Sequence, residues 1–531
     1  MLLRRLLAII WLVLICYVLG FTAKLFSQDV ATGAIRGTVL DATGARIPAA
    51  SVIVVNRATG VRRGLLTNEE GSFDAQMLTP GSYEVRVKAK GMSPLETKTL
   101  MVELGSIVEL RLTMRVAGAV ETVTVTDQST EVVALSTERA DVVNERSIED
   151  LPLDGRRFAD LALLSSNIVQ DPRSLTSDSN GDLASGGIRG FQTSFLVDGA
   201  DNNNGFYAQA RGRYRAPYQF SNEVVDEFRV NTTNYSAEVG RSGGAVINVV
   251  TRSGSNDFHG KAFYYLRDSL FGATSPYVGF KPTELQHQFG ATFGGPIKRN
   301  RVFFLIGYDQ HIFHVPTVVR FGDGSSALVP QPTDYEASDE TLVNLAASAL
   351  DQMAGTFTSG MVGGAGFAKV DVVLSPRELL SMRVNTSTYA GENSVYFNPA
   401  SPVTHYAMSE NGEEDVGTVS AIVSLKSSFG RRATNHLRVQ FSRDNETSSP
   451  NATYPRTQIE DILTGFGRSS ILPRNTNESK LHAAETLSVD THHHSWKLGG
   501  DVLASRVYNY YPLEFGGDYM FYPIKVNPIT F

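Results

Sequence analysis

Cysteine and basic clusters are scarce in this sequence. Its 531 residues include one cysteine, Cys16, which excludes a disulfide framework and a cysteine-rich zinc site. A formal net charge of -7 argues against binding to nucleic acid, because no basic surface is available. Charged residues make up only 19% of the chain, whereas Gly (47), Phe (28) and Tyr (20) are abundant. This composition favours strands and turns over helical bundles, and the length predicts several domains.

Long apolar runs are also missing, except at the N-terminus. Arg4 and Arg5 precede an apolar run over residues 6–21, which is slightly shorter than the roughly 20 residues of a spanning helix. Because the positive flank lies upstream, a secretory signal over residues 1–27 is favoured over a retained anchor. Cys16 lies inside this segment, so the mature chain would contain no thiol.

Short alternating segments separated by turn residues fill residues 28–115. In SYEVRVK, Tyr83, Val85 and Val87 point to one face of a strand, and the intervening charged residues point to the other. Five or more such strands predict a small β-sandwich. The segments GTVLDATGARIPAASVIVVNRATG and PGSYEVRVKAKGM resemble the carboxypeptidase regulatory-like domain, an accessory module in that family. The stretch contains no histidine, so a catalytic zinc site is not expected here.

A polar linker is expected at residues 116–130, and it contains the run ETVTV. One interpretation makes this run the last strand of the sandwich. The other is a resemblance to a TonB box, an extended peptide that pairs by strand addition with an inner-membrane energy transducer. The resemblance assigns that role to Glu121, Thr122, Val123, Thr124 and Val125.

Residues 131–255 carry several motifs that resemble a plug domain. SIEDLPLDGRRFADLALL is similar to the LPLNGRNF-type signature of TonB-dependent receptors of the Oar-like group, with Asp154 in place of the usual Asn. Its spacing predicts a helix over 156–164 with Phe158, Leu161 and Leu164 on one face. GGIRGFQTSFLVDGADNN and EVGRSGGAVINVVTRSG resemble the plug's later strands. The resemblance places these residues in the plug: Arg189, Gly190, Asp198, Gly199, Arg241, Gly243 and Gly244.

Local chemistry supports a compact α+β unit in this region. Asp198 and Gly199 suit a tight turn after a buried strand, and residues 246–250 read as a short strand buried on both faces. The RSGG segment suits close approach of two backbones. We expect Asp198 in a turn and Arg189 near the wall of a barrel, where a charge in a polar lumen can be paired.

Alternation of apolar and polar residues dominates residues 256–531. In HLRVQFS and FAKVDVVL, every second residue is apolar, which is typical of a transmembrane barrel strand that faces outer-membrane lipid. A soluble sandwich alternates too, so the preceding plug-like motifs favour the barrel. A hairpin is expected over 285–310 with its turn at 296–301, and a helix over 342–353 within an outer loop.

The length of this last region is short for a closed receptor. Plugged transporters need about 22 strands, and roughly 25 residues per strand yield about 11 here. The expected architecture is therefore mainly β, with a sandwich, a plug and a partial, open antiparallel barrel, and the chain resembles the N-terminal half of a longer receptor.

Three residue groups invite an enzymatic or metal-binding interpretation. His482 and Glu485 match half of a carboxypeptidase zinc site, but no third ligand follows at a suitable distance. Residues 492–494 are histidines, and adjacent residues of a strand point to opposite faces. Asp198, Asp201 and Asn203 lack the bidentate Glu of a calcium loop. No catalytic residue, metal or cofactor is predicted.

The resemblance implies a receptor in the outer membrane of a Gram-negative cell. It would take up a scarce or large ligand, such as a siderophore, an oligosaccharide or a peptide, with energy relayed by a TonB-type transducer. The alternative is an outer-membrane adhesion or assembly protein that transports nothing.

Overall fold

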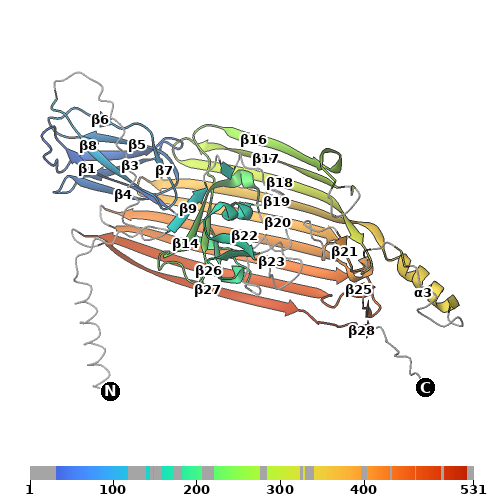
Figure 1. The fold of residues 1–531 in the computed structure, drawn as a ribbon. Helices are drawn as coiled ribbons and strands as arrows, with labels where there is room; N and C mark the ends of the chain where they lie inside the picture. Colours follow the sequence, from blue (N-terminus) through green and yellow to red (C-terminus); the bar gives the residue numbers. More distant parts are fainter. Residues whose placement is uncertain are drawn as a thin grey trace, which may run out of the picture.

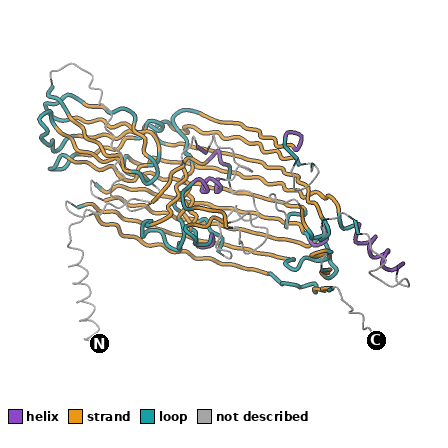
Figure 2. Tube along the Cα trace, viewed as in Figure 1, coloured by secondary structure: helices purple, strands orange, loops and turns teal. Residues whose placement is uncertain are grey.

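A computed structural model describes most of the chain after residue 31 (Figures 1 and 2). The predicted signal, the ETVTV run and residues 492–494 lie outside the described residues. Among the described residues, no helix is long and apolar enough to cross a membrane. The described ranges are 32–117, 139–143, 147–148, 158–171, 182–205, 220–274, 281, 284–322, 324, 327–328, 340–395, 403–430, 433–460, 462–491 and 495–522.

The N-terminal unit is a sandwich of two sheets, as predicted. One sheet has the order β4-β1-β8, and the other has the order β3-β2-β5-β6 with β7 beside β5. Tyr83, Val85 and Val87 are buried in the core between the sheets. The sequence did not reveal β3, β6 and β7. The bounds are β1 Gly33–Leu40, β2 Ser51–Asn56, β3 Arg62–Leu66, β4 Ser72–Leu78, β5 Gly81–Lys88, β6 Leu95–Glu96, β7 Leu100–Val102 and β8 Ile107–Thr113.

The described part of residues 139–251, here called the central unit, contains a five-stranded sheet of order β13-β12-β15-β14-β9. All six residues of β15 are buried, which confirms the doubly covered strand. The strands are β9 Arg139–Val143, β12 Ser194–Val197, β13 Ala200–Asp201, β14 Val225–Thr233 and β15 Val246–Thr251, with a separate hairpin of β10 Ile168–Asp171 and β11 Asp182–Ser185.

The helix predicted over residues 156–164 is present, but its type and its buried face differ from the prediction. It is a 3-10 helix, η2 (Phe158–Leu164), in which Leu161 is fully buried but Leu164 is 59% exposed. Leu164 was therefore wrongly assigned to the packed face. The helix ends at Leu164 and the chain turns away there, so the last residue does not continue the apolar stripe. Two shorter 3-10 helices are η3 Gly190–Gln192 and η4 Asn222–Val224.

The C-terminal part forms one large antiparallel sheet along the path β16-β17-β18-β19-β20-β22-β23-β26-β27. In the described residues β16 and β27 do not pair, so the sheet is open, as predicted. Nine long strands replace the expected 11 or so, because many are much longer than the assumed span of about 10 residues. They are β16 His259–Asp268, β17 Leu285–Lys298, β18 Val302–Val319, β19 Gly355–Ser375, β20 Glu378–Glu392, β22 Gly412–Phe429, β23 Ala433–Pro450, β26 Arg474–Asp490 and β27 Ser495–Tyr510.

The two faces of this sheet have opposite chemistry. Along β23, Leu437, Val439 and Phe441 are exposed, whereas His436 and Gln440 are buried. The same alternation holds on β19, where Val362 and Leu374 are exposed and the charged Lys369 and Asp371 are buried. The predicted barrel pattern is confirmed, with the polar face turned toward the central unit. We call that face the inner face.

The two ends of the sheet also differ. Connections are short at the end where the sandwich lies and long at the other, where helix α3 (Glu340–Asp351) projects (Figure 1). The β17–β18 turn is shorter than predicted, because Pro296 belongs to β17 and pairs with Phe303. The long connections contain η5 Ser269–Phe271, β21 Val403–Thr404, η7 Met408–Glu410, β24 Arg456–Ile459 and β25 Leu463–Phe466, and β28 Asp518–Phe521 follows β27.

Candidate functional site between the central unit and the sheet

A two-residue turn joins β12 to β13 and carries the predicted Asp198-Gly199 pair. Val197 pairs with Ala200 across it, and both turn residues have positive φ, +51° for Asp198 and +77° for Gly199. Asp-Gly is a preferred sequence for such a hairpin, because Asp tolerates and Gly favours the left-handed region. The turn is confirmed, and it aims the Asp198 carboxylate at the sheet.

Asp198 joins the central unit to strands β19 and β20. Its Oδ2 lies 2.8 Å from Nη1 of Arg383 on β20, and Thr251 donates to both carboxylate oxygens at 2.9 Å. Lys369 of β19 donates to the Thr251 carbonyl at 2.8 Å. Burial alone would raise the pKa of Asp198, but the charges of Lys369 and Arg383 and the Thr251 hydrogen bonds hold it below its ordinary value. Asp198 is therefore an ionised, tightly held anchor.

Asp201 follows Asp198 by three residues and makes a second ionic contact with the sheet, at strand β26. Its Oδ1 lies 2.7 Å from Nζ of Lys480, and its Oδ2 pairs with Arg241 of the central unit. The backbone N–H of Asp201 donates to Nδ1 of His482 at 3.3 Å. Nε2 of His482 then donates to Asp501 at 2.6 Å, which fixes the neutral tautomer. The contact therefore extends from the central unit to β27.

The segment after Asp201 extends this second contact. The N–H of Gly205 donates to Glu478 Oε2 at 2.7 Å, and Ser505 of β27 donates to Oε1 of the same carboxylate at 3.1 Å. A β-carbon built on Gly205 would lie 3.0 Å from the Ser505 hydroxyl. The segment from Asp198 to Gly205 thus bridges β20 and β26, which are separated in the sheet by β22 and β23.

Apolar packing joins the same two surfaces nearer β18. Leu305 of β18 and Phe367 of β19 belong to the same buried cluster as the core of the central unit. Gly307 lies so close to Val224 that an added β-carbon would approach the Val224 side chain to 2.8 Å. The inner face therefore completes the hydrophobic core of the central unit.

The other predicted plug residues lie within the central unit. The guanidinium of Arg189 is stacked 5.4 Å from the Phe191 ring centroid. Gly243 and Gly244 donate to the Gln192 carbonyl at 3.0 and 3.1 Å, so the RSGG segment provides the expected close approach. Gly190 begins η3 and is buried. Arg189 was expected near the wall and Asp198 in a turn, but it is Asp198 that forms an ion pair with the sheet.

The metal-binding alternatives find no support in the described residues. No group of three or more His, Cys, Asp or Glu side chains there could hold a metal ion. Asp198 and Asp201 face cationic side chains, which occupy the carboxylates that a calcium ion would need. His482 and Glu485 both lie on β26, three residues apart, where a strand turns them to opposite faces.

Sequence reasoning missed the partners on the sheet. Arg383, Lys369 and Lys480 are each at least nine-tenths buried on strands whose other face is apolar. A charge at an inward position of an alternating strand is the signal that could have identified them. Which carboxylate each one meets depends on packing between segments far apart in the chain.

Comparison with known proteins agrees with this architecture. Residues 34–115 match the carboxypeptidase regulatory-like domain, and residues 250–334 match an outer membrane beta barrel domain. The TonB-dependent transporter Oar of Myxococcus xanthus is 27% identical over 292 residues, which are 52% of this chain and 26% of that protein. The chain is homologous to this TonB-dependent transporter.

A solved outer-membrane transporter shows the same fold. The outer membrane transporter YddB from Escherichia coli matches with a TM-score of 0.52 at 12% identity, over 70% of this chain and 48% of that one. The siderophore receptor PirA from Acinetobacter baumannii matches with a TM-score of 0.47 at 11% identity, over 69% and 48%. The present chain spans about a quarter of Oar and about half of YddB and of PirA. Its β-barrel domain and its relative place it in the outer membrane.

Proposed function

We propose that the protein is a TonB-dependent outer-membrane transporter in which the central unit is the plug. In this assignment residues 1–27 are the signal, 28–115 the accessory sandwich, 116–130 the linker, 131–255 the plug and 256–531 the barrel portion. The exposed apolar outer face of the sheet suits lipid. The function is binding and passage of a solute, without catalysis.

The observation that carries the proposal is the pair of ionic contacts made by Asp198 and Asp201 with the inner face. These ion pairs lie beside the apolar contacts of Leu305 and Phe367, so movement of the central unit would separate both kinds of contact. The linker precedes β9, an edge strand of the central sheet. A transducer that binds residues 121–125 and pulls would apply force first to β9 and then to the two ionic contacts.

The transducer arm of the proposal is tested by replacing Val123 with proline, which removes a backbone donor needed for strand addition. Val133→Pro, outside the pentapeptide, is the matched control. We expect outer membranes carrying Val123→Pro to lose capture of the purified periplasmic domain of the host's TonB-type transducer, with the control unchanged. Equal capture by both variants would contradict the assignment of residues 121–125.

A second experiment distinguishes solute uptake from a role in adhesion or assembly. Mass spectrometry of spent medium compares solute depletion by cells with the full reading frame, cells with Val123→Pro and cells without the gene. Transport predicts a solute, of siderophore, oligosaccharide or peptide class, that is depleted only by the unmodified strain. Identical depletion by all three strains, with altered cell-surface adhesion, would favour the alternative.

A further inference from the structure

The sandwich is bound to the central unit through the turn at residues 103–106. The N–H of Leu104 donates to Glu227 Oε2 at 2.7 Å, and Nη1 of Arg229 donates to the Leu104 carbonyl at 2.6 Å. Gly105 has a φ of +66°, and a β-carbon there would lie 1.4 Å from Nη1 of Arg229. Glu227 and Arg229 are 4% and 8% exposed, so this contact is closed to solvent.

A second turn of the sandwich, at residues 58–60, is bound to the end of the large sheet. The N–H of Asn256 donates to the Ala58 carbonyl at 2.9 Å, and its side-chain amide donates to the Thr59 carbonyl at 2.5 Å. The same amide donates to Asn300 Oδ1, in the β17–β18 turn, at 2.8 Å. A β-carbon on Gly60 would lie 2.3 Å from that oxygen.

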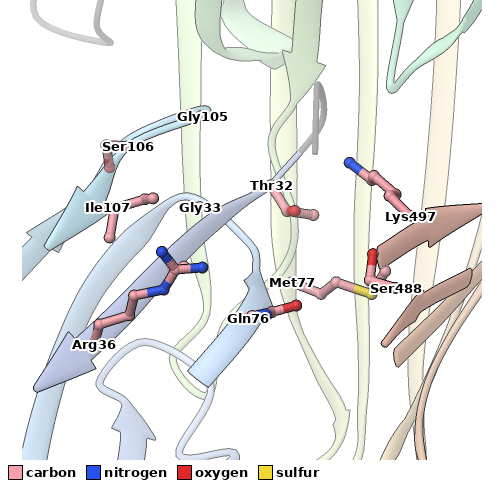
Figure 3. A pocket seen from close by; sticks show the side chains of 11 residues that line it. Thr32, Gly33, Arg36, Gln76, Met77, Gly105, Ser106, Ile107, Ser488 and Lys497 are labelled. Carbon is pink, nitrogen blue, oxygen red and sulfur yellow. The ribbon is translucent and has the colours of Figure 1, made fainter. Parts of the chain in front are cut away.

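The opposite side of the sandwich faces the β26–β27 end of the sheet. Ser488 and Lys497 line a cavity of about 20 Å³ together with sandwich residues such as Gly33 and Arg36 (Figure 3). This is room for about one water molecule. The sandwich therefore extends across the short-turn end, from the second strand of the sheet to its last two, with the central unit bound between these points.

We propose that the sandwich is a detachable cap over the short-turn end of the pore, docked through residues 58–60 and 103–106, and that ionisation of Glu227 undocks it. The role as a cap rests on the proposed transport function. The docking itself does not, because it concerns contacts inside the chain.

Glu227 is suited to this role because it is buried among groups that disfavour its charge. The pKa of Glu227 is raised to about 8, chiefly by burial; the Leu104 N–H and Arg229 lower it, and Asp226 on the same strand and Glu103 of the sandwich contribute to raising it. Once undocked, the carboxyl would return to its ordinary value of 4.5. The docked form then binds the proton more tightly, so docking weakens as pH rises from about 4.5 to 8 and is constant above that.

Distance measurement between two spin labels tests the proposal on the full-length protein in lipid. The labels are placed on the exposed Lys90→Cys of the sandwich and Arg299→Cys of the β17–β18 turn. Cys16, the single cysteine of these 531 residues, lies in the predicted signal. Double electron–electron resonance should give one narrow distance at pH 6. By pH 9 the ratio of docked to undocked molecules should fall roughly tenfold or more. The same narrow distance distribution at pH 6 and at pH 9 would overturn the proposed pH dependence of docking.

Three variants locate the effect. Glu227→Gln keeps an acceptor for Leu104 and should stay docked at both pH values. Gly105→Ala should give a broad distribution at both, because its methyl group meets Arg229. Gly44→Ala is the matched control, since Gly44 also has positive φ but no atom within 4 Å of an added β-carbon. If Gly105→Ala fails to reach the membrane, Asn256→Ala replaces it. A narrow distribution of the label-to-label distance in Gly105→Ala, or in Asn256→Ala where it is used instead, would overturn the docking. No transducer or solute takes part, so failure here is distinct from failure of the proposed transport.

Discussion

The central unit has two joints of different chemistry. Ion pairs from Asp198 and Asp201 bind it to the sheet, whereas backbone groups of the sandwich turn at residues 103–106 bind it on the other side. The first joint needs an ionised Asp198, and the docking proposed for the second is strongest when Glu227 is neutral. The joint to the sheet therefore weakens as pH falls through the lowered pKa of Asp198, and the joint to the sandwich weakens as pH rises from about 4.5 to 8.

The largest effect is expected from breaking the ionic joint on one side only. Arg383→Met removes one of the two cations that hold the buried Asp198 carboxylate and leaves only Lys369, a loss of up to about 3–5 kcal/mol in similar buried pairs. Hydrogen exchange of the β12 and β15 amides in outer-membrane preparations should accelerate. Adding Asp198→Asn should restore part of the protection, because it removes the unpaired carboxylate but also the charge that faces the buried Lys369. If protection from exchange is not restored, Arg383 stabilises the central unit through a contact other than the one with Asp198.

The apolar part of the same joint should be nearly as sensitive. Phe367→Ala removes a side chain that the sheet contributes to the core of the central unit, at a cost of about 3–5 kcal/mol. The loss should appear as faster exchange in β14 and β15, far from residue 367 in sequence. Val362→Ala, an exposed outer-face position on the same strand, is the control. Equal effects of the two changes would contradict a shared core.

A smaller effect is expected from the turn that presents Asp198. Gly199→Ala forces a side chain into φ of +77° and should destabilise the turn by about 1–2 kcal/mol. Gly187→Ala, at φ of +83° with open space around it, reports the backbone cost alone. The Asp198–Arg383 double-mutant coupling energy should shrink in the Gly199 variant and not in the Gly187 variant.

Particular residues show how far sequence alone reaches. The Asp-Gly turn, the sandwich strand of Tyr83 and the alternation around Val439 were predictable, because each depends on local dihedrals or a period of two. The pairing of Asp198 with Arg383 was not, because the two residues are 185 positions apart. Leu164 and Pro296 were misplaced at element ends, where packing decides the boundary.

The smallest effect concerns acid. The folded-state pKa of Asp198 lies below its ordinary value of 3.8. Its contribution to stability is therefore complete above that value and is lost as pH falls through the lowered pKa. Exchange in β12 should stay slow down to about pH 5 and rise below about pH 4. Asp198→Asn should flatten this acid step, and an unchanged step would assign it to other carboxylates.

A covalent bond across the sheet joint tests most directly whether the central unit must move for transport. Gly205→Cys and Ser505→Cys suit a disulfide, because a β-carbon on Gly205 lies 3.0 Å from the Ser505 hydroxyl. Cells carrying the oxidised pair should lose the transducer-dependent solute depletion and recover it with a reductant, while each single variant behaves like the unmodified protein. Undiminished depletion by the oxidised pair would contradict the account.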